Sequence, residues 1–159
     1  MATDAEQLSR ALIALMKADS TFNTLDAYYI GSPYDASILA QAEVCVVIPL
    51  GDDSTRQMTG TEYRRYFFDV VFLVKEPDTP TFTDGIAVIQ SHMSLLTYTQ
   101  GLRNILQDNA NNRLGSPTLD SGYQVVSVRT PSQTEAANEN RQNSYETLGT
   151  VPLEIEVLK

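Results

Sequence analysis

Residues able to do chemistry are few in this chain. The sequence holds one histidine, His92, one cysteine, Cys45, and no tryptophan. Cys45 lies in the apolar run Val44 to Pro49 without a basic neighbour, and His92 falls inside a predicted helix. A nucleophilic cysteine needs a lowered thiol pKa, and a catalytic or metal-binding histidine needs partners placed near it. We therefore expect a small core cysteine, a partly exposed helix histidine, no cofactor or metal, and no enzyme.

Charged side chains are the remaining candidates. Asp52 and Asp53 occupy a polar stretch that lacks the regularly spaced oxygen ligands of a calcium loop. Arg64 and Arg65 begin an alternating strand, where they suit either a solvated strand end or ion pairs with acidic side chains within or between subunits. A candidate interface set follows from these residues and the polar segments beside them: Asp52, Asp53, Arg56, Arg64, Arg65, Glu139 and Arg141.

Composition limits the classes of partner. The 159 residues suffice for one ordinary core, so a single domain over 1–159 is expected, and the formal net charge is -9. A field of this sign disfavours binding of DNA phosphates but suits a conduit that DNA passes without adhering. No window approaches the roughly 18 apolar residues of a membrane span, and an unpaired cysteine fits a reducing compartment.

The first half of the chain predicts one helix and three strands. Thr3 and Glu6 have the spacing of a capping box, and apolar residues then recur on one face, which predicts a helix from about Asp4 to Ala18. Short β patterns follow at residues 27–30 and 43–50. The polar stretch 51–61 is expected to be a long loop before the strongly alternating strand 63–75.

The second half predicts a long helix between strands. This helix is expected from Gly85 to about Gln107, with two apolar faces that either meet two neighbours or merge through a bend at Gly101. Strands are expected at 123–129 and 151–158. The segment 131–143 has almost no apolar residue and is expected to be a mobile arm, so the domain would carry extended loops at about 51–62 and 131–144. Consistent apolar faces predict a core of Leu8, Leu12, Leu15, Val46, Phe68, Val70, Phe72, Ile89, Met93, Leu153 and Ile155.

These elements define a fold class. Helical segments that can cover strands of this kind predict an α+β fold, with a mixed, mainly antiparallel sheet of about four to five strands. An N-terminal helix and a long central helix would flank that sheet.

The order of elements resembles that of the tail terminator and tail-completion proteins of tailed bacteriophages. Four segments carry the resemblance: the helix Gln-Leu-Ser-Arg-Ala-Leu-Ile-Ala-Leu-Met, the strand Tyr-Arg-Arg-Tyr-Phe-Phe-Asp-Val-Val-Phe-Leu-Val, the helix over 86–106 and the closing strand Val-Pro-Leu-Glu-Ile-Glu-Val-Leu. The likeness covers nearly the whole chain and is one of pattern, without a short diagnostic motif.

The resemblance implies a structural virion protein without catalytic residues. It implies a homo-oligomeric ring, a hexamer in that family, at the tail or neck of a particle assembled in the host cytoplasm. Its neighbours would be the tail tube protein and the head connector or neck proteins, and DNA would pass through its lumen. An alternative from another class is a small α+β module that binds a small molecule or peptide as a monomer or dimer.

Overall fold

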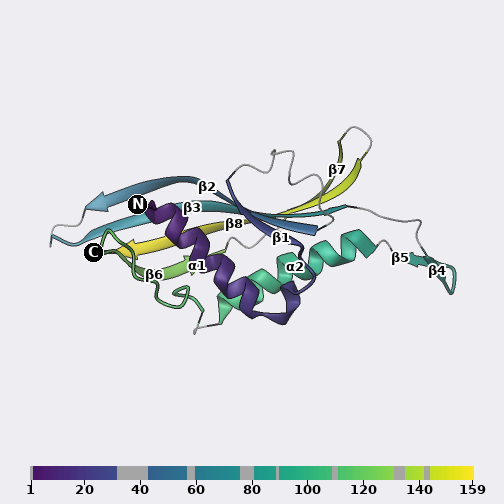
Figure 1. Cartoon of the computed structure of the whole chain (residues 1–159), viewed down its shortest axis with the longest axis horizontal. Helices are drawn as coiled ribbons and strands as arrows, with labels where there is room; N and C mark the ends of the chain where they lie inside the picture. The colour runs from purple at the N-terminus through teal and green to yellow at the C-terminus, as the bar shows by residue number, and fades with distance from the viewer. Residues whose placement is uncertain are drawn as a thin grey trace.

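The computed structural model describes residues 2–31, 43–56, 60–75, 81–88, 90–108, 111–130, 135–141 and 144–159. Two long helices and one large sheet dominate it (Figure 1). In chain order the elements are α1 (Asp4–Ala18), the short 3-10 helix η1 (Ser20–Phe22), β1 (Ala27–Ile30), β2 (Glu43–Arg56), β3 (Glu62–Lys75), β4 (Thr81–Thr83), β5 (Ile86–Val88), α2 (Gln90–Gln107), β6 (Gln124–Arg129), β7 (Glu135–Arg141) and β8 (Ser144–Leu158).

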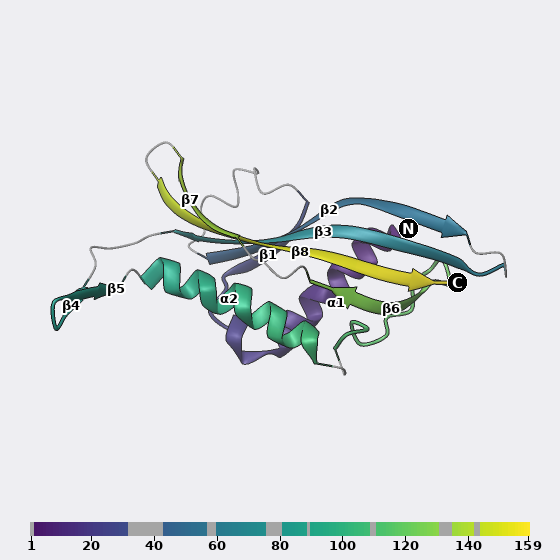
Figure 2. The same ribbon diagram turned by 180° about the vertical axis from the view of Figure 1, so that it is seen from behind.

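The main sheet is mixed and mostly antiparallel. Its strand order is β1-β2-β3-β8-β6, and β7 pairs with the first half of β8. β1 runs parallel to β2, whereas the other described pairings are antiparallel. Both long helices lie on the same face of the sheet (Figure 2). The predicted α+β architecture with an N-terminal and a central helix is confirmed, and β7 brings the sheet to six strands.

The helix α1 begins and ends where the sequence predicts. The Glu6 backbone N–H donates to the Thr3 hydroxyl oxygen at 3.2 Å, which satisfies one of the unpaired donors of the first helical turn. Leu8, Leu12 and Met16 then fall on one face at helical spacing and are buried against the sheet.

The main core lies between the two helices and the inner face of the sheet. Phe72 of β3 is fully buried, and its ring stacks on those of Phe22 and Tyr98 at centroid distances of 6.0 and 5.6 Å. Gly149 of β8 lies beneath α2, where an added Cβ would come within 2.8 Å of Leu95 Cγ. The absence of a side chain at this position therefore permits the close approach of α2 to the sheet.

Most of the predicted core is confirmed. Eight of the expected residues are buried, namely Leu8, Leu12, Val46, Phe68, Val70, Phe72, Leu153 and Ile155. Leu15 is only partly buried against this core, and Ile89 lies outside the described residues. Val46 packs with Val44, Val71 and Leu73 on the opposite face of the sheet, because side chains alternate along a strand.

The beginning of the central helix was predicted wrongly. Gly85 lies in the turn between β4 and β5, and α2 begins only at Gln90. Met93, predicted in the core, is 45% exposed. The described part of α2 buries a single face, formed by Leu95, Tyr98, Thr99, Leu102, Ile105 and Leu106, instead of the two faces expected. Ile86 and Val88 supplied the misleading apolar periodicity, since they belong to β5 and are exposed.

Two polar segments predicted as loops contain strands. Residues 51–56 continue β2 after a bulge between Pro49 and Gly51, and pair with β3 as far as Arg56 opposite Glu62. Within the predicted arm 131–143, residues 135–141 form β7, which pairs antiparallel with β8. Pairing with a long neighbouring strand satisfies the backbone groups of these segments although their sequences lack apolar alternation.

Candidate functional site

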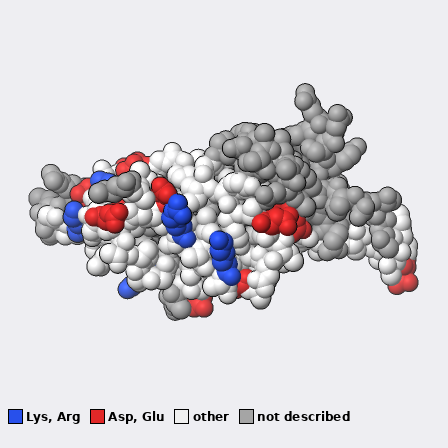
Figure 3. All heavy atoms as spheres, viewed as in Figure 1, with Lys and Arg blue, Asp and Glu red and all other residues white. Residues whose placement is uncertain are grey.

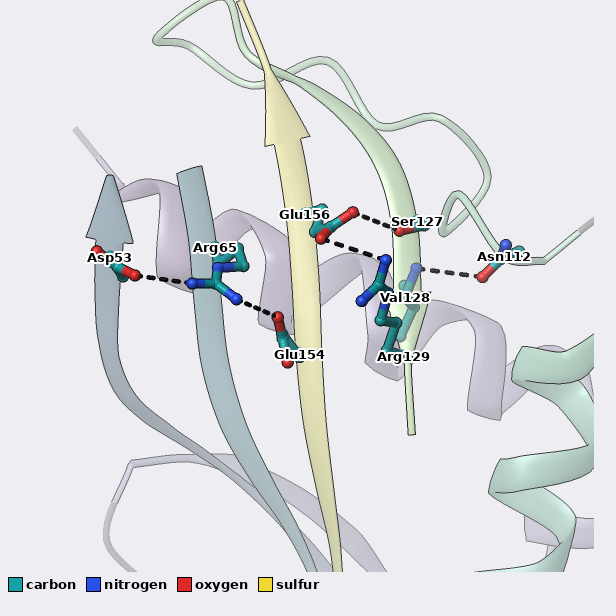
Figure 4. Close-up of polar contacts among 8 residues, drawn as sticks. All are labelled: Asp53, Arg65, Asn112, Ser127, Val128, Arg129, Glu154 and Glu156. Carbon is teal, nitrogen blue, oxygen red and sulfur yellow. Dashed lines mark hydrogen bonds and ion pairs between the residues drawn. The ribbon is translucent and has the colours of Figure 1, made fainter. Parts of the chain in front are cut away.

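A ladder of charges crosses the outer face of the sheet at the end where β2, β3, β8 and β6 lie side by side. The Arg65 guanidinium lies between two carboxylates, donating to Asp53 at 2.9 Å and to Glu154 at 3.2 Å (Figure 4). Further along the ladder, the Ser127 hydroxyl donates to Glu156 at 3.1 Å, and Arg129 forms an ion pair with Glu156 at 3.7 Å.

Strand register creates this ladder. Asp53 is directly opposite Arg65 across β2 and β3, and Arg65 is opposite Glu156 across β3 and β8. Glu154 is two residues from Glu156 and so shares its face, within diagonal reach of Arg65. The hydrogen bond with Asp53, followed by that with Glu154, raises the pKa of Arg65. The guanidinium is therefore held charged between two acidic neighbours.

A second cluster forms around Arg64 on the inner face at the same end of the sheet. Arg64 lies 3.2 Å from Glu62 and 3.7 Å from Asp52, donates to the Tyr66 hydroxyl at 3.3 Å, and stacks over the Tyr123 ring at 4.9 Å. The hydrogen bond with Tyr66 is the main cause that raises the pKa of Arg64.

This inner cluster also holds the start of α1. The Tyr66 hydroxyl donates to the Asp4 carboxylate at 3.1 Å, so it links β3 to the first turn of that helix. A carboxylate near a helix N-terminus is favoured by the helix dipole. The cluster around Arg64 therefore joins two elements of the same subunit.

The structure divides the predicted interface residues into groups. At one end of the sheet, Asp52 pairs with Arg64 on the inner face and Asp53 with Arg65 on the outer face, so these four form ion pairs within the chain. Arg56 is in register with Glu62 at the same end, but its side chain lies outside the described residues.

The other two predicted residues lie at a different end of the sheet. The backbone of Glu139 and Arg141 belongs to β7, and Glu139 is opposite Glu146 of β8. Glu146 precedes Glu156 by ten positions, or roughly 33 Å along a strand. The side chains of Glu139 and Arg141 lie outside the described residues, so the structure does not unite the seven predicted residues in one site.

Sequence reasoning missed the partners supplied by β6 and β8. Glu154, Glu156, Ser127 and Arg129 complete the outer ladder, and Tyr123 covers Arg64. The alternation of glutamates in the closing strand signalled a polar outer face. Choosing which arginine they meet required the register of β3 against β8.

Asp69, on the outer face of β3, has a pKa above the ordinary value of an aspartate. It lies in β3 opposite Ile48 on one side and Pro152 on the other. Partial burial beside these apolar neighbours raises the pKa of the Asp69 carboxyl, because desolvation disfavours its charged form.

The histidine and cysteine are placed as their sequence contexts predict. Cys45 is fully buried, with its Sγ 4.0 Å from the Met16 Sδ, and burial raises the pKa of its thiol. His92 is partly exposed on α2. Among the described residues, no group of three or more His, Cys, Asp or Glu side chains is arranged to hold a metal ion.

A pocket of about 240 Å³ opens beside the start of β6. Its lining comes from the preceding loop and the first residues of the strand: Arg113, Ser116, Pro117, Thr118, Leu119, Gly122, Tyr123, Gln124 and Val125. Ligand sites commonly occupy about 300–1,000 Å³ with convergent polar groups. This pocket is below that range.

Comparisons with protein-family models and with curated proteins find no significant match. In the part of the chain that the structure describes, no helix is both long and apolar enough to cross a membrane.

Proposed function

We propose that this chain is a non-enzymatic structural subunit of a tailed-phage virion. In this proposal it forms a homo-oligomeric ring, with six subunits, at the head–tail junction of a particle assembled in the host cytoplasm. The ring terminates or completes the tail, contacts the tail tube and the head connector or neck proteins, and lets DNA pass through its lumen.

Two exposed features carry the assembly part of the proposal. The described residues leave an apolar hairpin, β4–β5, exposed, with Phe82 at 71% and Ile86 at 66% exposure. They also leave the edge of β2 beyond Val47 without a neighbouring strand. Exposed apolar patches and open strand edges mark surfaces for association or aggregation. In a subunit that functions inside an assembly, the exposed hairpin and the open strand edge can both contact neighbouring subunits.

The order of elements supports the location in the virion. The helix, alternating strand, central helix and closing alternating strand on which the resemblance depends correspond to α1, β3, α2 and β8. α1 and α2 pack on the sheet in which β3 and β8 are neighbouring strands (Figure 1). The segments that carry the resemblance therefore form the architectural centre of this chain.

The charge distribution fits a conduit for DNA. On the face shown in Figure 3, the coloured Lys and Arg side chains occur singly or beside Asp and Glu, and those drawn form no continuous basic surface. With a formal net charge of -9, the subunit repels the phosphate backbone. Weak adhesion is what a passage for DNA requires.

The competing proposal, a ligand-binding module, has less support. The pocket beside β6 is small for a ligand, with a volume of about 240 Å³. The β4–β5 hairpin, which carries the exposed apolar residues, lies at the opposite end of the molecule from β6, beside which this pocket opens (Figure 1).

The solution mass of the purified protein tests the proposal. Light scattering and native mass spectrometry are carried out over a wide range of protein concentration, with and without purified tail tubes. We expect a hexamer, formed alone or on the tubes, and no salt-dependent binding of duplex DNA. A monomer or dimer under every condition, or tight DNA binding that weakens with salt, would contradict the proposed ring.

A further inference from the structure

Among the described residues, the β4–β5 hairpin forms a two-stranded sheet of its own, separate from the main sheet. Asp84 and Gly85 form its turn with φ values of 53° and 74°, and Thr83 pairs with Ile86 across it. Positive φ at both central residues is the type I′ geometry that Asp-Gly favours in tight hairpins. Each strand has only three residues, and an isolated ribbon of two strands is marginally stable in water.

Both faces of this hairpin carry exposed apolar side chains. Ile86 and Val88 share one face, whereas Phe82 points to the other. Their exposures are 66%, 50% and 71%, and Met93 in the first turns of α2 adds a side chain that is 45% exposed. The hairpin extends beyond the start of α2 at one end of the molecule (Figures 1 and 2). The subunit's own core therefore leaves these side chains in solvent.

The other large apolar residue that stands exposed among those described is Leu50, at 59%. Leu50 lies at the bulge of β2, just past the point where β1 stops pairing with that strand. From there to Arg56, β2 pairs with β3 on one side and with no described strand on the other. An apolar side chain thus marks the beginning of an open strand edge.

On the opposite edge of the sheet, formed by β6, a side chain covers part of the strand. The backbone N–H of Val128 in β6 donates to the Asn112 side chain at 3.1 Å (Figure 4). A side chain from the preceding loop therefore occupies one donor on that edge. Natural proteins cover strand edges in this way to prevent unwanted pairing, whereas β2 beyond Leu50 has no described strand beside it on its outer edge.

We infer that the β4–β5 hairpin of one subunit docks on the open β2 edge of a second copy of this chain, with Phe82, Ile86 and Val88 packed around Leu50. The inference rests on the proposed ring and names the contact that closes it. An added ribbon extends the neighbour's sheet through backbone hydrogen bonds, and the apolar side chains give affinity.

The arrangement of the two surfaces favours a second copy as the partner. The hairpin lies at one end of the molecule, whereas β2 beyond Leu50 runs toward the other end (Figure 1). A subunit that donates its hairpin keeps its own β2 edge free, so the contact is head-to-tail and can close into a ring.

Area and charge agree with this choice. The hairpin side chains and Met93 present roughly 400 Å² of surface, about half of what one partner contributes to an ordinary interface. A ring subunit makes the contact twice, once as donor and once as acceptor. Residues 81–88 carry one charge, Asp84, so this segment meets little repulsion from a copy whose net charge is -9.

Substitution of either surface tests the contact. Phe82→Ser combined with Ile86→Ser, and separately Leu50→Asp, should each weaken subunit association by about tenfold or more, while the thermal midpoint of the dissociated subunit stays unchanged. The matched control Asp84→Asn changes an exposed hairpin residue but keeps a turn-forming side chain, so it should associate as the wild type does.

Disulfide trapping tests the geometry. Leu50→Cys and Ile86→Cys are prepared as separate proteins, mixed and oxidised; the native Cys45 is fully buried and stays out of the reaction. We expect the disulfide between the two different variants to exceed that within either variant alone. Disulfides formed only between identical variants, or none at all, would overturn the docking arrangement.

The outcomes separate this contact from the proposed function. If the Phe82→Ser, Ile86→Ser variant forms rings as readily as the wild type does, the contact is refuted and the ring proposal remains. Trapping between positions 50 and 86 in open chains, without closed rings on tail tubes, would support the contact and refute the proposed function. A wild-type protein that remains monomeric and gives no mixed disulfide would refute both.

Discussion

Truncation of Phe72 is the sharpest test of the core. Its side chain is fully buried in β3 and stacks on Phe22 and Tyr98. Removing a phenyl ring from a core costs about 3–5 kcal/mol in unfolding free energy. With its two ring contacts also lost, Phe72→Ala should cost about 4 kcal/mol, the middle of that range. For a chain of this length, such a loss lowers the thermal midpoint by roughly 8–16 °C.

The assay is thermal and urea denaturation followed by circular dichroism, at a concentration where the protein is monomeric. Phe82→Ala is the matched control because it removes the same atoms from a side chain that is 71% exposed. We expect the control to change the unfolding free energy by less than about 0.5 kcal/mol. Equal losses in the two variants, or an unchanged midpoint in Phe72→Ala, would show that the assigned inner face of β3 is incorrect.

Three further predictions concern local features. Gly149→Ala should destabilise the subunit by about 1–3 kcal/mol in urea denaturation, because the added Cβ would come within 2.8 Å of Leu95; a neutral effect would refute the close packing of α2 on β8. Thr3→Ala should cost about 1 kcal/mol by removing the cap of α1, and Thr3→Ser should restore it. Burial raises the pKa of Asp69 in the folded state above its pKa in the unfolded state. The free-energy cost of burying the charged carboxylate is therefore present in full above the folded-state pKa, and it disappears as the pH falls toward the unfolded-state pKa. Asp69→Asn should therefore raise the midpoint at pH 7 more than at acid pH, and an equal rise at both would contradict this cause.

The sequence predicts those elements whose local signals agree with their packing. α1 has both a cap and one apolar face, and β3 alternates over most of its length, so both were placed closely. The polar half of β2 and the strand β7 were not predicted as strands. Their strand conformation depends on pairing with β3 and β8, and neither segment has an apolar face that signals it.

The start of α2 shows the opposite failure. Phe82, Ile86 and Val88 have apolar character without burial, and the sequence alone cannot distinguish apolar residues that face a core from those that face a partner. At the candidate site, Asp53 and Arg65 were both singled out, but their pairing with each other and with Glu154 follows from strand register. Register depends on the whole sheet, and a local pattern does not supply it.

Class averages of the purified protein bound to tail tubes, viewed along the tube axis by electron microscopy, test the central claim most directly. The proposed function predicts a closed ring of six subunits around an open lumen at the end of the tube. A particle without rotational symmetry, a ring with a filled centre, or tubes that end without the protein would contradict it.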